Sequence, residues 1–191
     1  MIVIKLGGSA YQHPCLATWL AQLQHLSLTM PMILVPGGGP FADAVRQAQS
    51  DLRFDDPTAH RMAIIAMRQF GLALLNLSPR SRPFQLSDPM PTTLSIWLPD
   101  DTISDNGLPQ SWDVSADSLA LWLAQTIQAH QLYLIKHTDD ILPYQPKMQN
   151  HLLDAHFRQL FLQQPIPTCL LPLAQPCTTT FIRFRYEQSL T

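Results

Sequence analysis

Hydrophobic residues in the first quarter of the chain follow two alternating patterns. Continuous apolar runs over residues 1–6 and 32–35 have the length of buried strands, and each ends in a cluster of glycines. Residues 14–28 carry apolar positions at helical spacing, and a second helix is expected over 41–49. Because strand, glycine turn and helix occur twice in this order, the sequence predicts a parallel sheet with crossover helices.

The remaining pattern predicts a long helix over 58–77, apolar around much of its circumference. A helix of this kind is buried either in the core or against a second subunit. A proline-rich loop is expected over 79–91. Further strands are expected at 94–98, 132–135, 169–171 and 181–184, and further helices within 111–128 and 151–162. No linker separates these elements, so we expect one domain over residues 1–191.

Composition narrows the classes of function. With 191 residues, 46% of them hydrophobic, the chain can form one compact domain with a sizeable core. The net charge of -2 offers no basic surface for nucleic acid, so no nucleic-acid partner is expected. No apolar run is long enough to span a membrane and no leader-type segment is visible, so a cytoplasmic protein without membrane contact is expected. Charged residues make up only 14% of the chain, which favours self-association.

The two glycine turns, Gly7–Gly8 and Gly37–Gly39, are candidate phosphate-binding elements. Glycine allows close approach of the backbone to a ligand, and the start of a helix offers unpaired N–H groups. Neither turn matches the GxxxxGK[ST] pattern of P-loop proteins or the GxGxxG pattern of dinucleotide-binding folds. Taken singly, a segment such as "PGGGP" is more often a plain tight turn than a ligand-binding element.

Two charged residues add to this pattern. Lys5, one of three lysines in the chain, lies two residues before Gly7, where its ammonium would point into the same space. Phosphoryl transfer depends on such positive charge, although an edge-strand lysine reaching into solvent is the alternative. Ser115 is a plausible helix N-cap, which places Asp117 in the first helical turn. There Asp117 either complements the helix dipole or holds lysines near a phosphate.

Four stretches, "VIKLGGS", "LVPGGGPFADAVR", "SWDVSADSLALWLA" and "LYLIKHTDD", have the order and spacing of the amino acid kinase superfamily. This superfamily includes acetylglutamate kinase, aspartokinase, uridylate kinase and isopentenyl phosphate kinase. The third stretch most resembles the small kinases of methanofuran biosynthesis, which convert an aminomethylfuran-methanol phosphate to a diphosphate. The resemblance covers roughly residues 1–140. It implies an α/β fold: a three-layer α/β/α sandwich around a mainly parallel sheet.

The resemblance also implies an ATP-dependent kinase that uses Mg²⁺, with an acceptor-side half over 1–110 and a reduced nucleotide-side half over 111–191. The implied catalytic residues are Lys5, Asp117 and Lys136. The implied nucleotide-binding residues are Gly7, Gly8, Ser9, Thr138 and Asp139. The candidate residues for a small anionic acceptor are Gly37, Gly38, Gly39, Arg46, Arg61 and Ser115, of which the two arginines are as easily surface charges. No protein-held metal site is expected, because the histidines are scattered without ligand spacing. Asp139 and Asp140 are candidates to assist with Mg²⁺, which in such kinases is held largely by nucleotide phosphates.

The helix at 58–77 corresponds to one that lines the acceptor site and often builds a dimer in the family, so a homodimer is expected. The second half departs from the family pattern: "TDDILP" replaces "TDVDGV", and no glycine follows Gly107. Lys147 and Arg158 are alternatives to Lys136 as the second cation. These departures leave a second hypothesis open, that of a non-catalytic relative that binds a nucleotide or metabolite or joins a complex.

Overall fold

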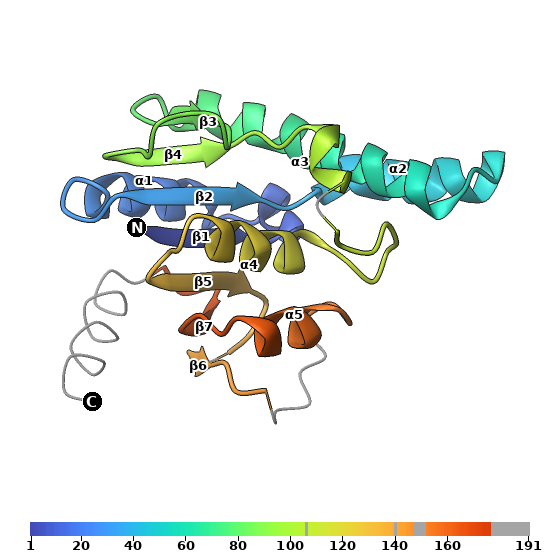
Figure 1. Ribbon diagram of the computed structural model, residues 1–191. Helices are drawn as coiled ribbons and strands as arrows, with labels where there is room; N and C mark the ends of the chain where they lie inside the picture. The colour runs from blue at the N-terminus through green and yellow to red at the C-terminus, as the bar shows by residue number, and fades with distance from the viewer. Residues whose placement is uncertain (106, 140, 147–151, 177–191) are drawn as a thin grey trace.

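Seven strands of the described residues form one central sheet (Figure 1). The computed structural model describes residues 1–105, 107–139, 141–146 and 152–176. The strands are β1 (Ile2–Leu6), β2 (Met32–Pro36), β3 (Arg82–Phe84), β4 (Leu94–Trp97), β5 (Gln131–Lys136), β6 (Leu142–Pro143) and β7 (Thr168–Pro172). Their order is β3-β4-β2-β1-β5-β7-β6, and only the β6–β7 pair among these described strands is antiparallel.

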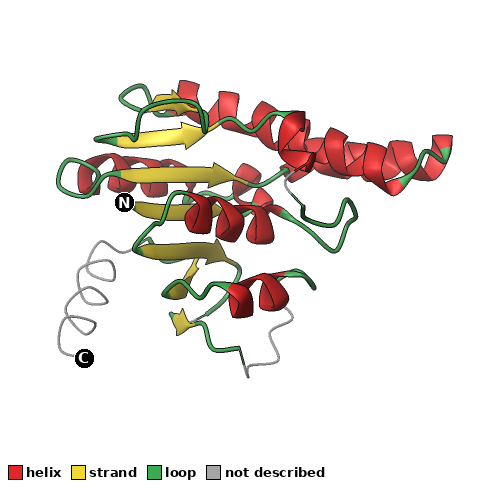
Figure 2. Cartoon of the chain, viewed as in Figure 1, coloured by secondary structure: helices red, strands yellow, loops and turns green. Residues whose placement is uncertain are grey.

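Helices cover both faces of this sheet, so the fold is the expected three-layer α/β/α sandwich (Figures 1 and 2). The helices are α1 (Leu16–Leu26), α2 (Gly39–Leu52), α3 (Asp56–Leu77), α4 (Ala116–Thr126) and α5 (Phe157–Gln163). Helices α4 and α5 pack in one core with Val3 of β1, whereas α1 and the C-terminal part of α3 pack in a second core with the next residue, Ile4. This alternation is what a strand buried on both faces requires.

Strand β1 lies at the centre of the sheet, hydrogen-bonded to β2 on one side and β5 on the other. Lys5 therefore belongs to a central strand and is only 5% exposed. The alternative of an edge-strand lysine reaching into solvent is wrong. By the two-residue repeat of a strand, Lys5 shares the face of Val3, which is covered by α4.

The predicted strands and helices within the described residues are present, with boundaries shifted by a few residues. Strand β3 was missed, because its proline made the segment look like a loop. Pro83 is tolerated there because β3 pairs with β4 alone, at the edge of the sheet. The short β6 and a 3₁₀ turn over Gly8–Gln12 were also missed. The strand expected at 181–184 lies outside the described residues.

Side-chain oxygens accept hydrogen bonds at the start of two predicted helices. Helix α4 starts at Ala116, and Ser115 caps it as predicted, because its hydroxyl oxygen accepts a hydrogen bond from the Asp117 N–H. Helix α5 starts at Phe157 rather than 151, where the Asp154 carboxylate accepts from the Phe157 N–H. Within the described residues, none of the helices combines the length and hydrophobicity that a membrane span needs.

Candidate active site

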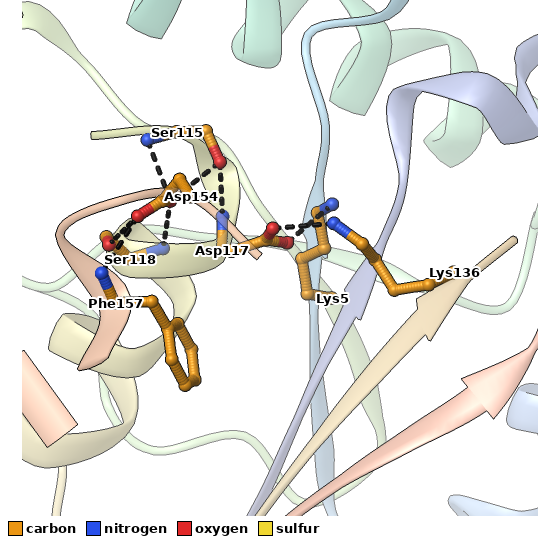
Figure 3. Close-up of polar contacts among 7 residues, drawn as sticks. All are labelled: Lys5, Ser115, Asp117, Ser118, Lys136, Asp154 and Phe157. Atoms are coloured by element: carbon orange, nitrogen blue, oxygen red, sulfur yellow. Dashed lines mark hydrogen bonds and ion pairs between the residues drawn. The ribbon is translucent and has the colours of Figure 1, made fainter. Parts of the chain in front are cut away.

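Three charged side chains meet at the carboxyl edge of the sheet, where β1 and β5 end and α4 begins. The Asp117 carboxylate lies between the two lysines, with Lys5 Nζ 2.8 Å from Oδ1 and Lys136 Nζ 2.6 Å from Oδ2 (Figure 3). We call Lys5, Asp117 and Lys136 the ion triad. The structure thus brings together all three residues that the sequence assigned to catalysis.

The parallel sheet explains why the two lysines meet. Lys5 is in register with Leu134 on the neighbouring strand β5, and both lie on the face covered by α4. Lys136 follows two residues after Leu134, so it points to the same face one step closer to the carboxyl edge. The first turn of α4 crosses above this edge and supplies Asp117.

Burial makes the charges of the ion triad interdependent. Burial acts to raise the pKa of Asp117, but the nearby charges of Lys5 and Lys136 and their hydrogen bonds outweigh it and hold this pKa below the usual aspartate value. Burial and the Lys5 charge lower the pKa of Lys136, against the opposing attraction of Asp117. With all three groups ionised, two cations face one anion, and the cluster keeps one positive charge for an anionic ligand.

Asp154 is a site residue that the sequence did not reveal. Its carboxylate accepts hydrogen bonds from the main-chain N–H groups and the hydroxyls of Ser115 and Ser118, at 2.5–3.0 Å (Figure 3). These partners lie 36 and 39 positions away in the chain, so no local pattern connects them. Ser115, which the sequence assigned to the acceptor, uses its main-chain N–H and its hydroxyl in these capping contacts.

The two glycine turns pack directly against each other. A Cβ atom on Gly37 would lie 2.3 Å from the Gly8 nitrogen, and one on Gly8 would lie 2.4 Å from the Gly39 nitrogen. Only glycine fits at Gly8 and Gly37, and the reason here is the close approach of two backbone segments. The Gly7 and Gly37 N–H groups are bonded to the carbonyls of Ile135 and Leu6, so they tie the turns to the ends of β5 and β1.

A pocket of about 450 Å³ opens beside the turns and reaches Lys5. Of the predicted site residues, it is lined by Lys5, Gly8, Ser9, Gly37, Gly38, Gly39, Arg46 and Ser115. Its other walls come from the 3₁₀ turn, α2, α3, Trp112 and the start of α4, and they are largely apolar. They also include Asp43 of α2, the ion-pair partner of Arg46. Burial lowers the pKa of His60 in this wall, against its hydrogen bond to the Ser111 main chain, so the imidazole is neutral at pH 7. Lys5 and Arg46 therefore supply the positive charge of the lining.

Residues 1–78 match the model of the Amino acid kinase family. The structure resembles UMP kinase from Bacillus anthracis with a TM-score of 0.68 over 95% of this chain and 90% of the other, at 15% sequence identity. The resemblance to the amino acid kinase superfamily is confirmed. Uridylate kinase from Archaeoglobus fulgidus gives a TM-score of 0.65 over 90% of each chain at 13% identity.

Sequence similarity to one known protein extends beyond residues 1–78. The [5-(aminomethyl)furan-3-yl]methyl phosphate kinase of Methanocaldococcus jannaschii is 24% identical over 147 residues, which cover 74% of this chain and 68% of the relative. The similarity to this relative supports the resemblance to the kinases of methanofuran biosynthesis. The sheet that carries the turns and the ion triad therefore has the amino acid kinase fold.

The two arginines predicted to meet an acceptor occupy different positions in this fold. The Arg46 guanidinium lies over the Trp112 ring, 4.3 Å from its centroid, and forms an ion pair with Asp43 at 2.9 Å. It lines the pocket, and Gln49 holds the Trp112 indole N–H at 2.7 Å. Arg61 is exposed on α3 and does not line the pocket.

Of the nucleotide-binding candidates, Gly8 and Ser9 line the pocket, whereas Gly7, Thr138 and Asp139 do not. Thr138 and Asp139 lie two and three residues beyond the end of β5, at the same carboxyl edge as Lys136, and Asp139 is exposed. Arg158 instead donates a hydrogen bond to the Pro146 carbonyl at 2.7 Å. Asp140 and Lys147 lie outside the described residues. Among the described alternatives, Lys136 is therefore the second cation that contacts Asp117.

The close contact between the turns leads to a stability prediction. Gly37→Ala should lower the free energy of unfolding by about 2–4 kcal/mol, because its Cβ overlaps backbone atoms of Gly8 that cannot rotate away. Gly107→Ala is the matched control: its φ of +85° carries strain worth about 1 kcal/mol, but no atom lies within 4 Å of the added Cβ. Urea unfolding measures both. An equal loss in the two variants would contradict the packing argument.

The ion triad leads to a second prediction. Asp117→Asn should cost about 3–5 kcal/mol of unfolding free energy at pH 7, because it leaves two ammonium groups buried without their anion. Lys136→Met should cost clearly less, since Asp117 keeps Lys5 as its partner. Urea unfolding of the two variants at equal pH tests this order. The triad does not act as argued if the Lys136 variant is the less stable of the two.

Proposed function

We propose that the chain is an ATP-dependent kinase that transfers the γ-phosphoryl group of ATP to a phosphate or carboxylate group of a small molecule. The observation that carries this proposal is the Asp117 carboxylate held between Lys5 and Lys136, with Lys5 also lining a pocket beside two glycine turns. The family match over residues 1–78 and the kinase relative support a phosphotransferase.

The ion triad suits the chemistry of phosphoryl transfer. In this reaction the protein contributes mainly positioning and positive charge for the oxygens of the moving group. The central strand fixes Lys5 and the adjacent strand fixes Lys136, so neither ammonium needs to reorganise during the reaction. Asp117 orients both lysines through its two oxygens, and one anion does not cancel the charges of two cations.

Mg²⁺ is the metal that such a reaction implies. In the described residues, no group of three or more histidines, cysteines or acids could hold a metal ion. We propose that this ion arrives on nucleotide phosphates, because Mg²⁺ is commonly held by substrate phosphates and one or two carboxylates. Of the predicted nucleotide-binding residues, Asp139 is exposed at the carboxyl edge and is the acid nearest in sequence to Lys136.

The acceptor is proposed to bind in the pocket between the glycine turns and α3. An apolar wall with cationic groups at two places, Lys5 and Arg46, suits a small molecule with an apolar body and an anionic group. The similarity to a [5-(aminomethyl)furan-3-yl]methyl phosphate kinase supports the phosphate of an aminomethylfuran precursor as this acceptor.

Two variants test the kinase proposal. ATP with Mg²⁺ should raise the melting temperature of the wild-type chain, and ADP should form when candidate phosphate acceptors are added. Lys5→Met should lower kcat by about 10²–10³, because it removes a fixed positive charge from the transferred group. Arg80→Met is the control and should leave kcat unchanged. It removes an exposed charge from the turn before β3, at the amino ends of the strands and away from the carboxyl edge that holds the ion triad.

The alternative is a non-catalytic relative that binds a nucleotide or metabolite, which the glycine-free segment after Gly107 favours. If ATP stabilises the wild type and no acceptor yields ADP, this alternative replaces the kinase. If ATP stabilises neither the wild type nor the Lys5 variant, the nucleotide-binding proposal fails as well.

We also propose a cytoplasmic homodimer formed through α3. Ile65 and Leu72 lie seven residues apart on this helix and are 44% and 52% exposed, so they form an outward apolar face. Leu72→Glu should shift the chain from dimer to monomer in light scattering after size exclusion. Leu162→Glu, at a 53% exposed position on α5, is the control and should leave the dimer intact. A wild type that is monomeric at all concentrations would overturn the dimer.

A further inference from the structure

The carboxylate of Asp154 is the hydrogen-bond acceptor for the first turns of two helices. Its Oδ2 atom accepts from the Ser115 N–H at 2.9 Å, the Ser115 hydroxyl at 2.7 Å and the Ser118 N–H at 3.0 Å. Its Oδ1 atom accepts from the Ser118 hydroxyl at 2.5 Å and the Phe157 N–H at 2.9 Å. One side chain thus satisfies donors of α4 and α5 together (Figure 3).

These contacts lie on both sides of Asp117 in the chain. Ser115 precedes Asp117 by two residues, and its hydroxyl oxygen accepts a hydrogen bond from the Asp117 N–H at 3.2 Å. Ser118 follows Asp117 directly. With both flanking residues held by one carboxylate, the main chain at Asp117 has a fixed position, and its side chain can extend only toward β1 and β5.

We propose that Asp154 is a positioning residue that holds the first turn of α4 so that the Asp117 carboxylate meets Lys5 and Lys136. The part of this proposal that concerns reaction rate rests on the proposed kinase function. The part that concerns the ion triad rests on the hydrogen bonds alone.

An ordinary helix cap needs fewer hydrogen bonds than Asp154 accepts. Helix α3 is capped by a local residue, since Asp55 Oδ1 accepts from the Thr58 N–H at 3.0 Å. Helix α4 already has Ser115 as its own cap. Asp154 comes from a separate segment of the chain and binds on both sides of the triad carboxylate. It also adds a negative charge whose attraction acts to raise the pKa of Lys136.

A second tie between the same helices provides a matched control. Gln125, near the end of α4, donates to the carbonyls of Leu160 at 3.1 Å and Gln164 at 2.7 Å. It joins α4 to α5 about two turns away from the triad. Gln125→Leu therefore weakens the contact between the helices and leaves the first turn of α4 intact.

The sequence makes a direct readout of the triad possible, because it contains three lysines. Selectively labelled lysine gives one NMR signal each for Lys5, Lys136 and Lys147, assigned with the Lys5→Met and Lys136→Met variants. Asp154→Asn should shift the Lys5 and Lys136 signals. Gln125→Leu should leave these two signals in place. Unchanged Lys5 and Lys136 signals in Asp154→Asn overturn the proposal.

Kinetics test the second part. Asp154→Asn should lower kcat by about 10–100-fold with little change in KM for ATP, since a small misplacement of reacting groups lowers rate more than binding. Gln125→Leu should keep both parameters near wild type. An equal loss of kcat in the two variants means that Asp154 acts through general stability, and overturns the positioning role.

Two other results, an unfolded Asp154 variant and an inactive wild type, also have defined consequences. If Asp154→Asn does not fold, Ser118→Ala decides, because it removes one hydroxyl contact and should shift the same two lysine signals by a smaller amount; no shift then overturns the proposal. If the wild type transfers no phosphate to any acceptor, the kinase function fails, while the lysine signals still decide whether Asp154 holds the triad.

Discussion

The carboxylate of Asp117 between two lysines is the interaction on which the site depends. Removing three ionised groups from water is costly, and it is tolerated where attraction and hydrogen bonds compensate. Here one anion pairs with two cations at 2.8 and 2.6 Å, so with all three groups ionised the cluster keeps one positive charge. That excess charge lies beside the pocket and can be used by an anionic ligand.

The fold is what makes this cluster possible. Its members come from β1, β5 and the start of α4, and they approach one another only when the sheet has formed and the helix has crossed over it. Parallel order brings the ends of neighbouring strands to one edge, and the α4 turn closes over that edge. The glycine turns reinforce the arrangement, because their contact ties the ends of β1 and β2 together.

Much of this could be predicted from the sequence because its signals are local. The apolar runs, the glycine turns, Lys5 and the Ser115 cap each lie within a few consecutive residues. Asp154 and the contact of Arg46 with Trp112 could not be found in this way, since their partners lie 36 to 66 positions away. Strand β3 was missed for a different reason: its pairing with β4 outweighs a proline that locally favours a loop.

The arrangement also indicates where the site can vary. Lys5 and Lys136 lie on adjacent hydrogen-bonded strands, so the separation of their backbones is set by the sheet. The position of Asp117 is not set by strand pairing, because Asp117 lies in the first turn of α4. The orientation of that turn depends on the side-chain hydrogen bonds that it forms with Asp154. The positions of the lysines are therefore properties of the fold, whereas the position of their shared anion depends on side-chain contacts from a separate segment. A substitution near the start of α5 can therefore move Asp117 and alter the proposed phosphoryl transfer, even though the substituted residue contacts no ligand.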